Sequence, residues 1–505
     1  MTTSDALPPG PDFAQGVAFE SIPVSGILAG HVDGSAVLLS RLHDGVFAVS
    51  GTCTHYGAPL AEGLVVDGEV RCPWHHACFS LRTGHALRAP AFAALKAWRV
   101  EVVGERVFVR AELDAAPTPS PTHPRVNPDR IVIVGGGAAG FAAAERLRSL
   151  GFSGALSMLS ADPAPPCDRP NLSKDYLAGT ASEDWIPLQP AQFYPDRRID
   201  LQLGCEVAHI DTAQREVRTL SGERFAYDAL LIATGAEPVR LSLSGFDLPN
   251  VFTLRSLADA NAIIHAAVGA KSAALVGAGF IGLEVANSLR QRGLDVHVIA
   301  RDSVPMEKVL GRELGDFITG LHREHGVAFH LQRVPTQFDG RLLTLDDGTT
   351  IAADILIVGV GVKPRAQIAV EAGLAVDNGV LVDAHLQTSV PGVYAAGDVA
   401  NFPYGADRVR IEHWVHAERQ GQCVAANMLG DRQAFGDVPF FWSHHYDFDI
   451  RYAGHAVGWD DVRIEGSLAA RDCVARYFRN GILLAAASIG RDRENLAIEA
   501  ELRKI

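Results

Sequence analysis

Residues 131–140 read IVIVGGGAAG, and this stretch decides the fold of most of the chain. Four consecutive apolar residues are typical of a parallel strand that is buried on both faces. The glycines that follow allow a tight turn into a helix, expected over residues 141–150, whose positive N-terminus attracts a pyrophosphate. The stretch therefore predicts the first strand, turn and helix of a Rossmann-like unit that binds a dinucleotide.

Residues 272–282, SAALVGAGFIG, repeat the pattern. A strand, a glycine turn and the start of a helix follow in the same order, so we expect two dinucleotide sites. An acidic side chain about twenty residues past the first turn is placed to accept a ribose hydroxyl. The predicted residues of the first site are Gly135, Gly137, Ala138, Ala139, Gly140 and Asp162, and those of the second are Gly277, Gly279, Phe280, Ile281 and Gly282.

The sequence leaves the nicotinamide nucleotide open between NADH and NADPH. In the second unit, Ala300 stands where an acidic residue usually binds the ribose of NAD. Arg301, which follows it, is suited to the 2′-phosphate of NADP, whereas Asp302 is suited to the ribose of NAD.

Two short loops near the N-terminus each offer one thiolate and one imidazole. Residues 53–55 read CTH and residues 72–75 read CPWH. A Rieske [2Fe-2S] centre needs two cysteines on one iron and two histidines on the other. A zinc site is the alternative, but zinc sites usually group like ligands as C-x-x-C and H-x-x-x-H. The spacing favours the cluster, with ligands Cys53, His55, Cys72 and His75.

The chain also divides by composition. Short β-type runs separated by turns predict a small all-β domain before residue 114, and five prolines then mark a spacer between domains. The glycine fingerprints end near residue 438, where strand-like runs of a separate domain begin. The predicted parts are residues 15–113, a linker over 114–128, a first dinucleotide-binding domain over 129–250 and 368–437, a second over 251–367, and a C-terminal domain over 438–505.

Composition excludes several classes of protein. The chain has 505 residues, 48% of them apolar, and a formal net charge of −14 that argues against nucleic acid or an anionic membrane as the main partner. Seven scattered cysteines form no disulfide framework. We see no secretory signal and no membrane span, and therefore expect a cytoplasmic protein, either a monomer or a homodimer.

A resemblance to known families makes these expectations more specific. The region from about residue 129 onward resembles the FAD-dependent ferredoxin reductases of the putidaredoxin reductase and biphenyl dioxygenase reductase type. The two N-terminal loops resemble those of Rieske ferredoxins, and the whole chain resembles the apoptosis-inducing-factor-like proteins. The matching stretches of the reductase region are DRPNLSK at 168–174, ATG at 233–235, GVKP at 361–364, AGDV at 396–399 and PFFWS at 439–443.

The resemblance implies a multidomain fold with three cofactors. An N-terminal all-β Rieske domain would precede two Rossmann-like α/β domains of the glutathione-reductase type and an α+β C-terminal domain. The cofactors are then FAD, a Rieske [2Fe-2S] cluster and NADH or NADPH. One departure lies in the second cluster loop, where His76 replaces the usual glycine. Histidine reaches the left-handed backbone region at a modest cost, and the two-residue spacing favours His75 over His76 as the ligand.

The resemblance also implies roles for individual residues. Lys174 is expected near the flavin ring, facing Glu284 and the nicotinamide. Trp414 is expected along the ring and Trp442 on its acceptor side, with core packing as the alternative for both tryptophans. Further expected cofactor contacts come from Arg169, Ala233, Thr234, Gly235, Gly361, Gly397 and Asp398.

We therefore expect electrons to pass from NAD(P)H to FAD, then to the Rieske cluster, and then to an external one-electron acceptor such as an oxygenase, a cytochrome P450 or another metalloprotein. Flavin is needed because a nicotinamide delivers a hydride whereas an iron-sulfur cluster accepts single electrons. One alternative is a redox sensor in which NAD(P)H binding changes the domain arrangement. Another is a small-molecule reductase in which the cluster is an accessory.

Overall fold

Strand β11 (Arg130–Val134) lies at the centre of a five-stranded parallel sheet, as its four buried apolar residues require. The computed structural model describes residues 8–114 and 128–504; the proline-rich linker lies outside this range except for its two end residues. Helices α1 (Ala138–Ser149) and α8 (Trp414–Met428) pack against each other beside this sheet. In order, its strands are β13 (Asp200–Gln202), β12 (Ala155–Leu159), β11, β17 (Ala229–Ile232) and β29 (Val393–Ala395).

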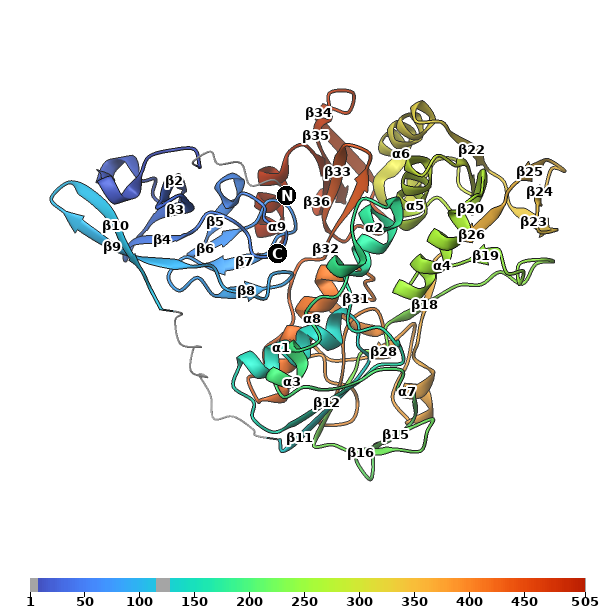
Figure 1. Ribbon diagram of the computed structural model, residues 1–505, viewed down its shortest axis with the longest axis horizontal. Coiled ribbons are helices and arrows are strands. Elements are labelled where there is room, and N and C mark those ends of the chain that lie inside the picture. Colours follow the sequence, from blue (N-terminus) through green and yellow to red (C-terminus); the bar gives the residue numbers. More distant parts are fainter. Residues whose placement is uncertain (1–7, 115–127, 505) are drawn as a thin grey trace.

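The second glycine turn belongs to a second parallel sheet of the same kind. Helix α5 (Phe280–Gln291) follows strand β20 (Ser272–Val276) through this turn. Helices α4 (Leu257–Ala267) and α6 (Glu307–Glu324) belong to the same unit (Figure 1). Its strands, in order, are β19 (Val251–Phe252), β26 (Ile355–Val358), β20, β21 (Asp295–Ala300) and β22 (Val327–Leu331).

Smaller elements complete the two Rossmann-like units. Three-stranded sheets, two of them antiparallel and one mixed, belong to these units, and a two-stranded ribbon joins them where the chain crosses between units. The strands are β14 (Val207–Asp211), β15 (Glu216–Thr219) and β16 (Arg224–Ala226); β23 (Pro335–Phe338), β24 (Leu342–Leu345) and β25 (Thr350–Ala352); β28 (Val380–Leu381), β30 (Ala400–Tyr404) and β31 (Asp407–Val409); and the ribbon β18 (Ala236–Pro238) with β27 (Val362–Pro364). The short helices are α2 (Asp175–Ala178), α3 (Phe193–Asp196), α7 (Gln367–Glu371), η4 (Arg169–Ser173) and η5 (Glu183–Trp185).

The N-terminal domain is built from antiparallel strands, as the sequence predicts. Its larger sheet has the order β1-β10-β9-β4-β3-β2, and its smaller sheet, β5-β6-β7-β8, supports the two loops that hold the cysteines and histidines. The strands are β1 (Val17–Ala18), β2 (Leu28–Val32), β3 (Ser35–Leu42), β4 (Gly45–Ser50), β5 (Leu64–Val66), β6 (Glu69–Arg71), β7 (Cys78–Ser80), β8 (Ala86–Arg88), β9 (Ala97–Val103) and β10 (Arg106–Glu112), with 3-10 turns η1 (Phe13–Gln15), η2 (Phe19–Ser21) and η3 (Leu60–Glu62).

The C-terminal domain lies between the N-terminal domain and the second Rossmann-like unit (Figure 1). Its five-stranded antiparallel sheet is followed by helix α9 (Asp492–Leu502), which contacts strand β5 of the N-terminal domain. This helix makes the fold α+β, as expected. The sheet has the order β32 (Phe440–His445), β33 (Phe448–Gly454), β36 (Ile482–Ile489), β35 (Asp472–Arg479) and β34 (Asp461–Ser467).

The structure corrects the start of the first predicted helix. Helix α1 begins at Ala138 rather than at residue 141, because the last part of the glycine motif already forms the first helical turn. All seven cysteines are free thiols. Across residues 8–114 and 128–504, no helix has both the length and the apolar character needed to cross a bilayer.

A buried carboxyl group on α1 predicts a pH-dependent stability. Burial raises the pKa of Glu145 to about 7, and Arg197, 4.0 Å away, offsets this only in part. The native state therefore keeps a proton that the unfolded state releases near pH 4.5, so this site lowers stability as the pH rises from 4.5 to above 7. We expect Glu145→Gln to remove a cost of about 3 kcal/mol at pH 8 and less than about 1 kcal/mol at pH 5.

Thermal unfolding at the two pH values checks this prediction. The Tm difference between the variant and the parent protein should be several-fold larger at pH 8 than at pH 5. Glu223→Gln, a change at an exposed carboxylate of the same unit, is the control. Equal Tm differences at both pH values would show that the pKa of Glu145 is not raised in the native protein.

Candidate functional site

One large cavity runs along the carboxyl ends of both parallel sheets. Its volume is about 2050 Å³, well above the 300–1,000 Å³ typical of a small-molecule pocket. All the residues predicted from the glycine motifs and the reductase resemblance line it, with the exception of Gly140. The cavity therefore joins the two predicted dinucleotide sites into one continuous space.

Gly140 serves the site by its packing. A Cβ atom at this position would lie 2.0 Å from the carbonyl oxygen of Gly135, so only glycine lets the helix approach the turn this closely. Gly135 itself has φ +118°, a conformation that favours glycine. The second turn repeats this contact between Gly282 and Gly277.

Two other glycines leave open space where a dinucleotide would pass. A Cβ atom added at Gly137 would meet nothing closer than 3.8 Å, and one at Gly279 would meet nothing within 4 Å. Both residues line the cavity at the N-terminus of a helix, α1 and α5 respectively. Bare backbone at these two helix N-termini fits FAD and a nicotinamide nucleotide.

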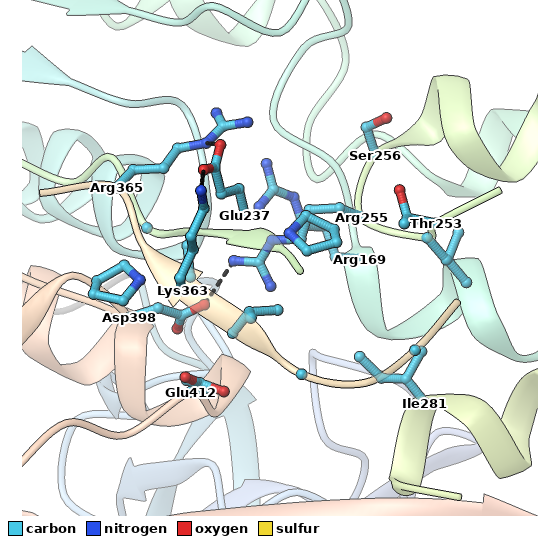
Figure 2. A pocket seen from close by; sticks show the side chains of 18 of the residues that line it. Arg169, Glu237, Thr253, Arg255, Ser256, Ile281, Lys363, Arg365, Asp398 and Glu412 are labelled. Carbon is cyan, nitrogen blue, oxygen red and sulfur yellow. Dashed lines mark hydrogen bonds and ion pairs between the residues drawn. The ribbon is translucent and has the colours of Figure 1, made fainter. Parts of the chain in front are cut away.

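Charged side chains line the cavity between the two turns (Figure 2). Arg255 forms an ion pair of 2.6 Å with Asp398, and Arg169 lies 4.0 Å from Asp162. Sequence reasoning missed Arg255, because it belongs to no motif. Arg255 therefore fixes the orientation of the Asp398 carboxylate, which is expected to contact a cofactor.

Lys174 and Glu284 meet in the middle of the cavity, as expected from the resemblance. The Lys174 Nζ donates to Glu284 Oε2 at 2.9 Å and to the carbonyl oxygen of Pro170 at 3.0 Å. Ser173 Oγ donates to the same carboxylate oxygen at 2.6 Å, and Ser443 Oγ donates to the other at 2.8 Å. Glu284 is buried, only 14% of the Lys174 side chain is exposed, and both carboxylate oxygens are hydrogen-bonded, so the pair is unlike a solvated surface pair.

Both tryptophans that the sequence singled out line the cavity. Trp414 begins helix α8, and Trp442 lies in strand β32 of the C-terminal domain. The Nζ of Lys174 lies 5.7 Å from the centre of the Trp442 ring, within the range of a cation–π contact. Trp442 therefore forms the part of the wall that separates the Lys174–Glu284 pair from the N-terminal domain.

The four predicted cluster ligands come together as two like pairs. The Nδ1 atoms of His55 and His75 are 3.2 Å apart, and the thiols of Cys53 and Cys72 are hydrogen-bonded neighbours. A Rieske centre binds one iron through two cysteines and the other through two histidines, and this pairing fits that requirement. Among the described residues, no three or more His, Cys, Asp and Glu side chains are arranged as a site for a single metal ion.

His76 does not face the predicted ligands Cys53, His55, Cys72 and His75. Its φ is +59°, in the left-handed region that the replaced glycine would favour. Its Nδ1 lies 2.6 Å from Glu499 Oε2, whereas the neighbouring His75 faces His55. The structure thus brings His75, and not His76, into the ligand set.

The ligand set and the large cavity are separated by one side chain. The rings of His75 and Trp442 have their centres 4.2 Å apart at an angle of 49°. His75 is buried, with 6% of its surface exposed, while Trp442 also lines the cavity. Trp442 therefore links the wall of the cavity to a predicted cluster ligand.

Comparison with known proteins agrees with this arrangement. Residues 129–421 match the family described as pyridine nucleotide-disulphide oxidoreductase, residues 20–99 match the Rieske [2Fe-2S] domain, and residues 440–502 match the reductase C-terminal domain.

The relatives include proteins with and without the N-terminal domain. Apoptosis-inducing factor 3 of Homo sapiens is 34% identical over 90% of this chain and 78% of its own length. Rhodocoxin reductase of Rhodococcus erythropolis is 37% identical over 73% of this chain and 88% of its own length. Among solved structures, the covalent putidaredoxin reductase–putidaredoxin complex matches with a TM-score of 0.72 and 31% identity, over 74% of this chain and 93% of that one.

The close approach at Gly140 predicts a specific loss of flavin. We expect Gly140→Ala to open the first turn and to lower the amount of FAD retained on purification by about tenfold or more, because the added methyl group meets a backbone oxygen. The ratio of flavin to protein absorbance measures this. Gly320→Ala within α6, where a Cβ atom meets nothing within 4 Å, is the matched control, and full flavin content in Gly140→Ala would contradict the prediction.

Proposed function

This chain belongs to the pyridine nucleotide-disulphide oxidoreductase family and has a Rieske [2Fe-2S] domain at its N-terminal end, and from this premise we propose the route that its electrons take. It is an NAD(P)H-dependent oxidoreductase of the ferredoxin-reductase type with FAD and a Rieske cluster as cofactors. In our proposal, electrons pass from NAD(P)H through FAD to the chain's own cluster, and from there to an external one-electron acceptor protein.

The observation that carries this proposal is the contact between His75 and Trp442. It joins a predicted cluster ligand to the wall of the cavity beside Lys174 and Glu284. The N-terminal domain therefore places a predicted cluster ligand directly against the wall of the cavity. The known relatives support the same assignment, because several are named as ferredoxin reductases that serve dioxygenase or demethylase systems.

FAD supplies the conversion between hydride transfer and one-electron transfer, and the Rieske cluster supplies a one-electron relay. The chain's own residues prepare the site for this chemistry. The Lys174 ammonium would supply a positive charge to a reduced, anionic flavin bound beside it, and Glu284 would balance and orient that charge. Gly137 and Gly279 leave their backbone open for the two pyrophosphates.

The overall reaction follows from the electron count. One NAD(P)H gives two electrons and one hydrogen nucleus as hydride, so two molecules of a one-electron acceptor are reduced while NAD(P)⁺ and one proton are formed. A thiol route is disfavoured, because no closely spaced pair of cysteines follows the first strand, turn and helix in the sequence: Cys167 stands alone there, and it is buried. We place the external acceptor among oxygenases, cytochromes P450 and other metalloproteins.

Variants that block only the second half of the route, from FAD to the cluster and the external acceptor, test the proposal. We expect Cys72→Ser to lower the iron and sulfide content and to slow reduction of an external one-electron acceptor by about 100-fold or more, since it removes a ligand. We expect Trp442→Leu to keep the iron but to slow cluster reduction. In both variants, stopped-flow absorbance should show flavin reduction by NAD(P)H at the parent rate.

Cys205→Ser, a change at a cysteine far from the cluster loops in sequence, is the control for the cysteine variant. Full acceptor reduction by Cys72→Ser would place the cluster outside the route. A reduced flavin–nucleotide complex that persists in the parent protein in the presence of acceptor would favour a redox sensor over an electron transferase.

We propose NADPH as the nucleotide, a choice that the sequence leaves open. Arg301 is exposed on the cavity wall, and Ala300 before it offers no carboxylate to a ribose hydroxyl. We expect Arg301→Ala to raise the KM for NADPH by about tenfold and to change that for NADH little, because a charge-assisted bond to the 2′-phosphate is lost. Steady-state kinetics with both nucleotides measure this.

Asp302→Ala is the comparison variant at the neighbouring cavity residue. If the ribose of NADH is instead held by Asp302, this variant raises the KM for NADH, and Arg301→Ala leaves that for NADPH unchanged. That result would contradict the assignment to NADPH.

A further inference from the structure

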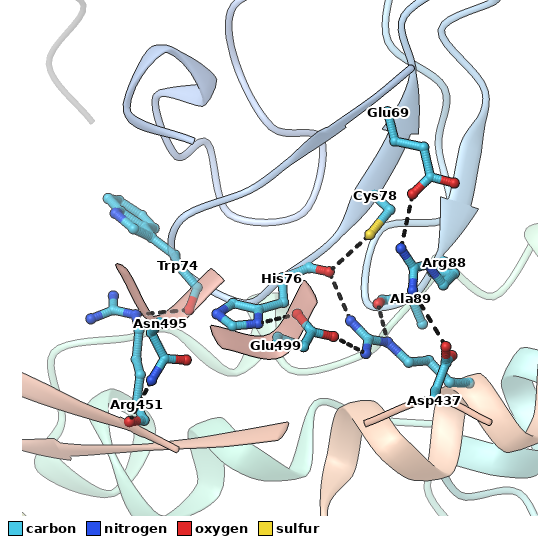
Figure 3. A network of polar contacts seen from close by, with 11 residues as sticks. Glu69, Trp74, His76, Cys78, Arg88, Ala89, Asp437, Arg451, Asn495 and Glu499 are labelled. Carbon is cyan, nitrogen blue, oxygen red and sulfur yellow. Dashed lines mark hydrogen bonds and ion pairs between the residues drawn. The ribbon is translucent and has the colours of Figure 1, made fainter. Parts of the chain in front are cut away.

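The second cluster loop lies on a buried charged network that spans three parts of the chain (Figure 3). The Nδ1 of His76 lies 2.6 Å from Glu499 Oε2, and Arg419 pairs with the other oxygen of Glu499 at 2.9 Å. Arg419 also donates to the carbonyl oxygen of His76 at 2.8 Å. All three residues are at most 2% exposed. We call these three residues the docking triad.

The charges within the docking triad are balanced. Burial alone would raise the pKa of Glu499, but Arg419 and His76 outweigh it, so the pKa of this carboxyl lies well below its usual range. Glu499 and Arg419 therefore form a buried ion pair. The Nδ1 of His76 is hydrogen-bonded to the same carboxylate, and its ring stacks on Phe440 with the ring centres 3.8 Å apart.

Further bonds hold the backbone on both sides of the cluster ligand His75. Arg451 of strand β33 donates to the carbonyl oxygen of Trp74 at 3.0 Å, and it is itself held by Asp492 of helix α9 at 2.8 Å. Arg419 donates to the carbonyl oxygen of Ala89 at 3.2 Å. The loop that presents His75 to Trp442 is thus fixed at residues 74 and 76.

Buried ion networks specify an arrangement more than they stabilise it. Desolvation offsets much of the Coulomb attraction between buried charges, so their remaining polar contacts matter. Glu499 and Arg419 come from α9 and α8, outside the N-terminal domain. A domain that covers this pair in another position deprives it of the His76 imidazole and the His76 carbonyl oxygen that it contacts here. The network therefore selects one docked position.

We propose that the N-terminal domain stays docked during turnover, and that His76 is the positioning residue that keeps His75 against Trp442. This inference rests on the proposed function, because it concerns how the chain passes electrons between its own domains. It assigns a role to the one residue at which the second loop departs from the ferredoxin pattern. A tethered domain that releases and rebinds in each turnover would not require the buried docking triad.

A change in linker length distinguishes a domain that stays docked from one that is only tethered. We would insert 40 Gly/Ser residues after residue 121 in the parent chain and in His76→Gly, which removes the imidazole at a backbone position suited to glycine. Small-angle X-ray scattering reports the docking, and stopped-flow absorbance reports reduction of the cluster by NAD(P)H. Glu501→Gln, on the exposed side of α9, is the control for Glu499→Gln on its buried side.

The two mechanisms give different results. With a docked domain, the longer linker leaves the cluster-reduction rate and the folded dimensions of the parent unchanged. In His76→Gly and Glu499→Gln, the longer linker increases the maximum dimension and slows cluster reduction by about sevenfold, because the effective concentration falls with the −3/2 power of linker length. His76→Asn, whose amide can donate to Glu499 and which tolerates the left-handed backbone, should restore the parent behaviour in part.

The proposal would be overturned if the longer linker lowered the cluster-reduction rate of the parent protein. It would also be overturned if the His76→Gly variant remained compact with either linker. Failure of the proposed function has a different signature. In that case NAD(P)H reduces the flavin but not the cluster in the unmodified chain, whatever the linker, while the scattering comparison still reports whether the docking triad holds the domain.

Discussion

The contact between the His75 imidazole and the Trp442 indole is the constraint on which the architecture depends. One ring belongs to the ligand set of the N-terminal domain, and the other lines the cavity that holds the Lys174–Glu284 pair. An arrangement of this kind requires the C-terminal domain to lie between its neighbours, as it does (Figure 1). A small displacement of the N-terminal domain would separate the two rings, and this explains why charged side chains fix the loop on each side of His75.

The two Rossmann-like units form the rigid part of the site. In each, buried apolar strands place a glycine turn at the carboxyl edge of a parallel sheet, and the first residues of the next helix face the same cavity. The chain leaves the first unit, builds the second and returns through strand β29, which pairs with β17. That return brings Asp398 to the cavity, where Arg255 from the start of the second unit meets it.

Sequence patterns predicted the local parts of this molecule well and the contacts between distant segments less well. The glycine turns follow from strand and turn chemistry within about ten residues, and the pairing of Cys53 with Cys72 and of His55 with His75 follows from cluster chemistry. The proximity of Lys174 and Glu284 came from family resemblance, because no local pattern relates residues 110 positions apart. Arg255, Arg419 and Glu499 had no sequence signal, since buried polar residues of this kind are recognisable only by their partners.

The sequence by itself determined which cofactors this protein can hold, because strand periodicity, glycine turns and ligand spacing act over short stretches of chain. Only the tertiary structure decided how the cofactor sites face one another. That arrangement depends on packing between surfaces far apart in sequence, such as Trp442 against His75, and on balancing buried charges such as Glu499 with Arg419 and His76. The sequence shows two adjacent histidines at residues 75–76, and only the fold shows that the second of them contacts Glu499.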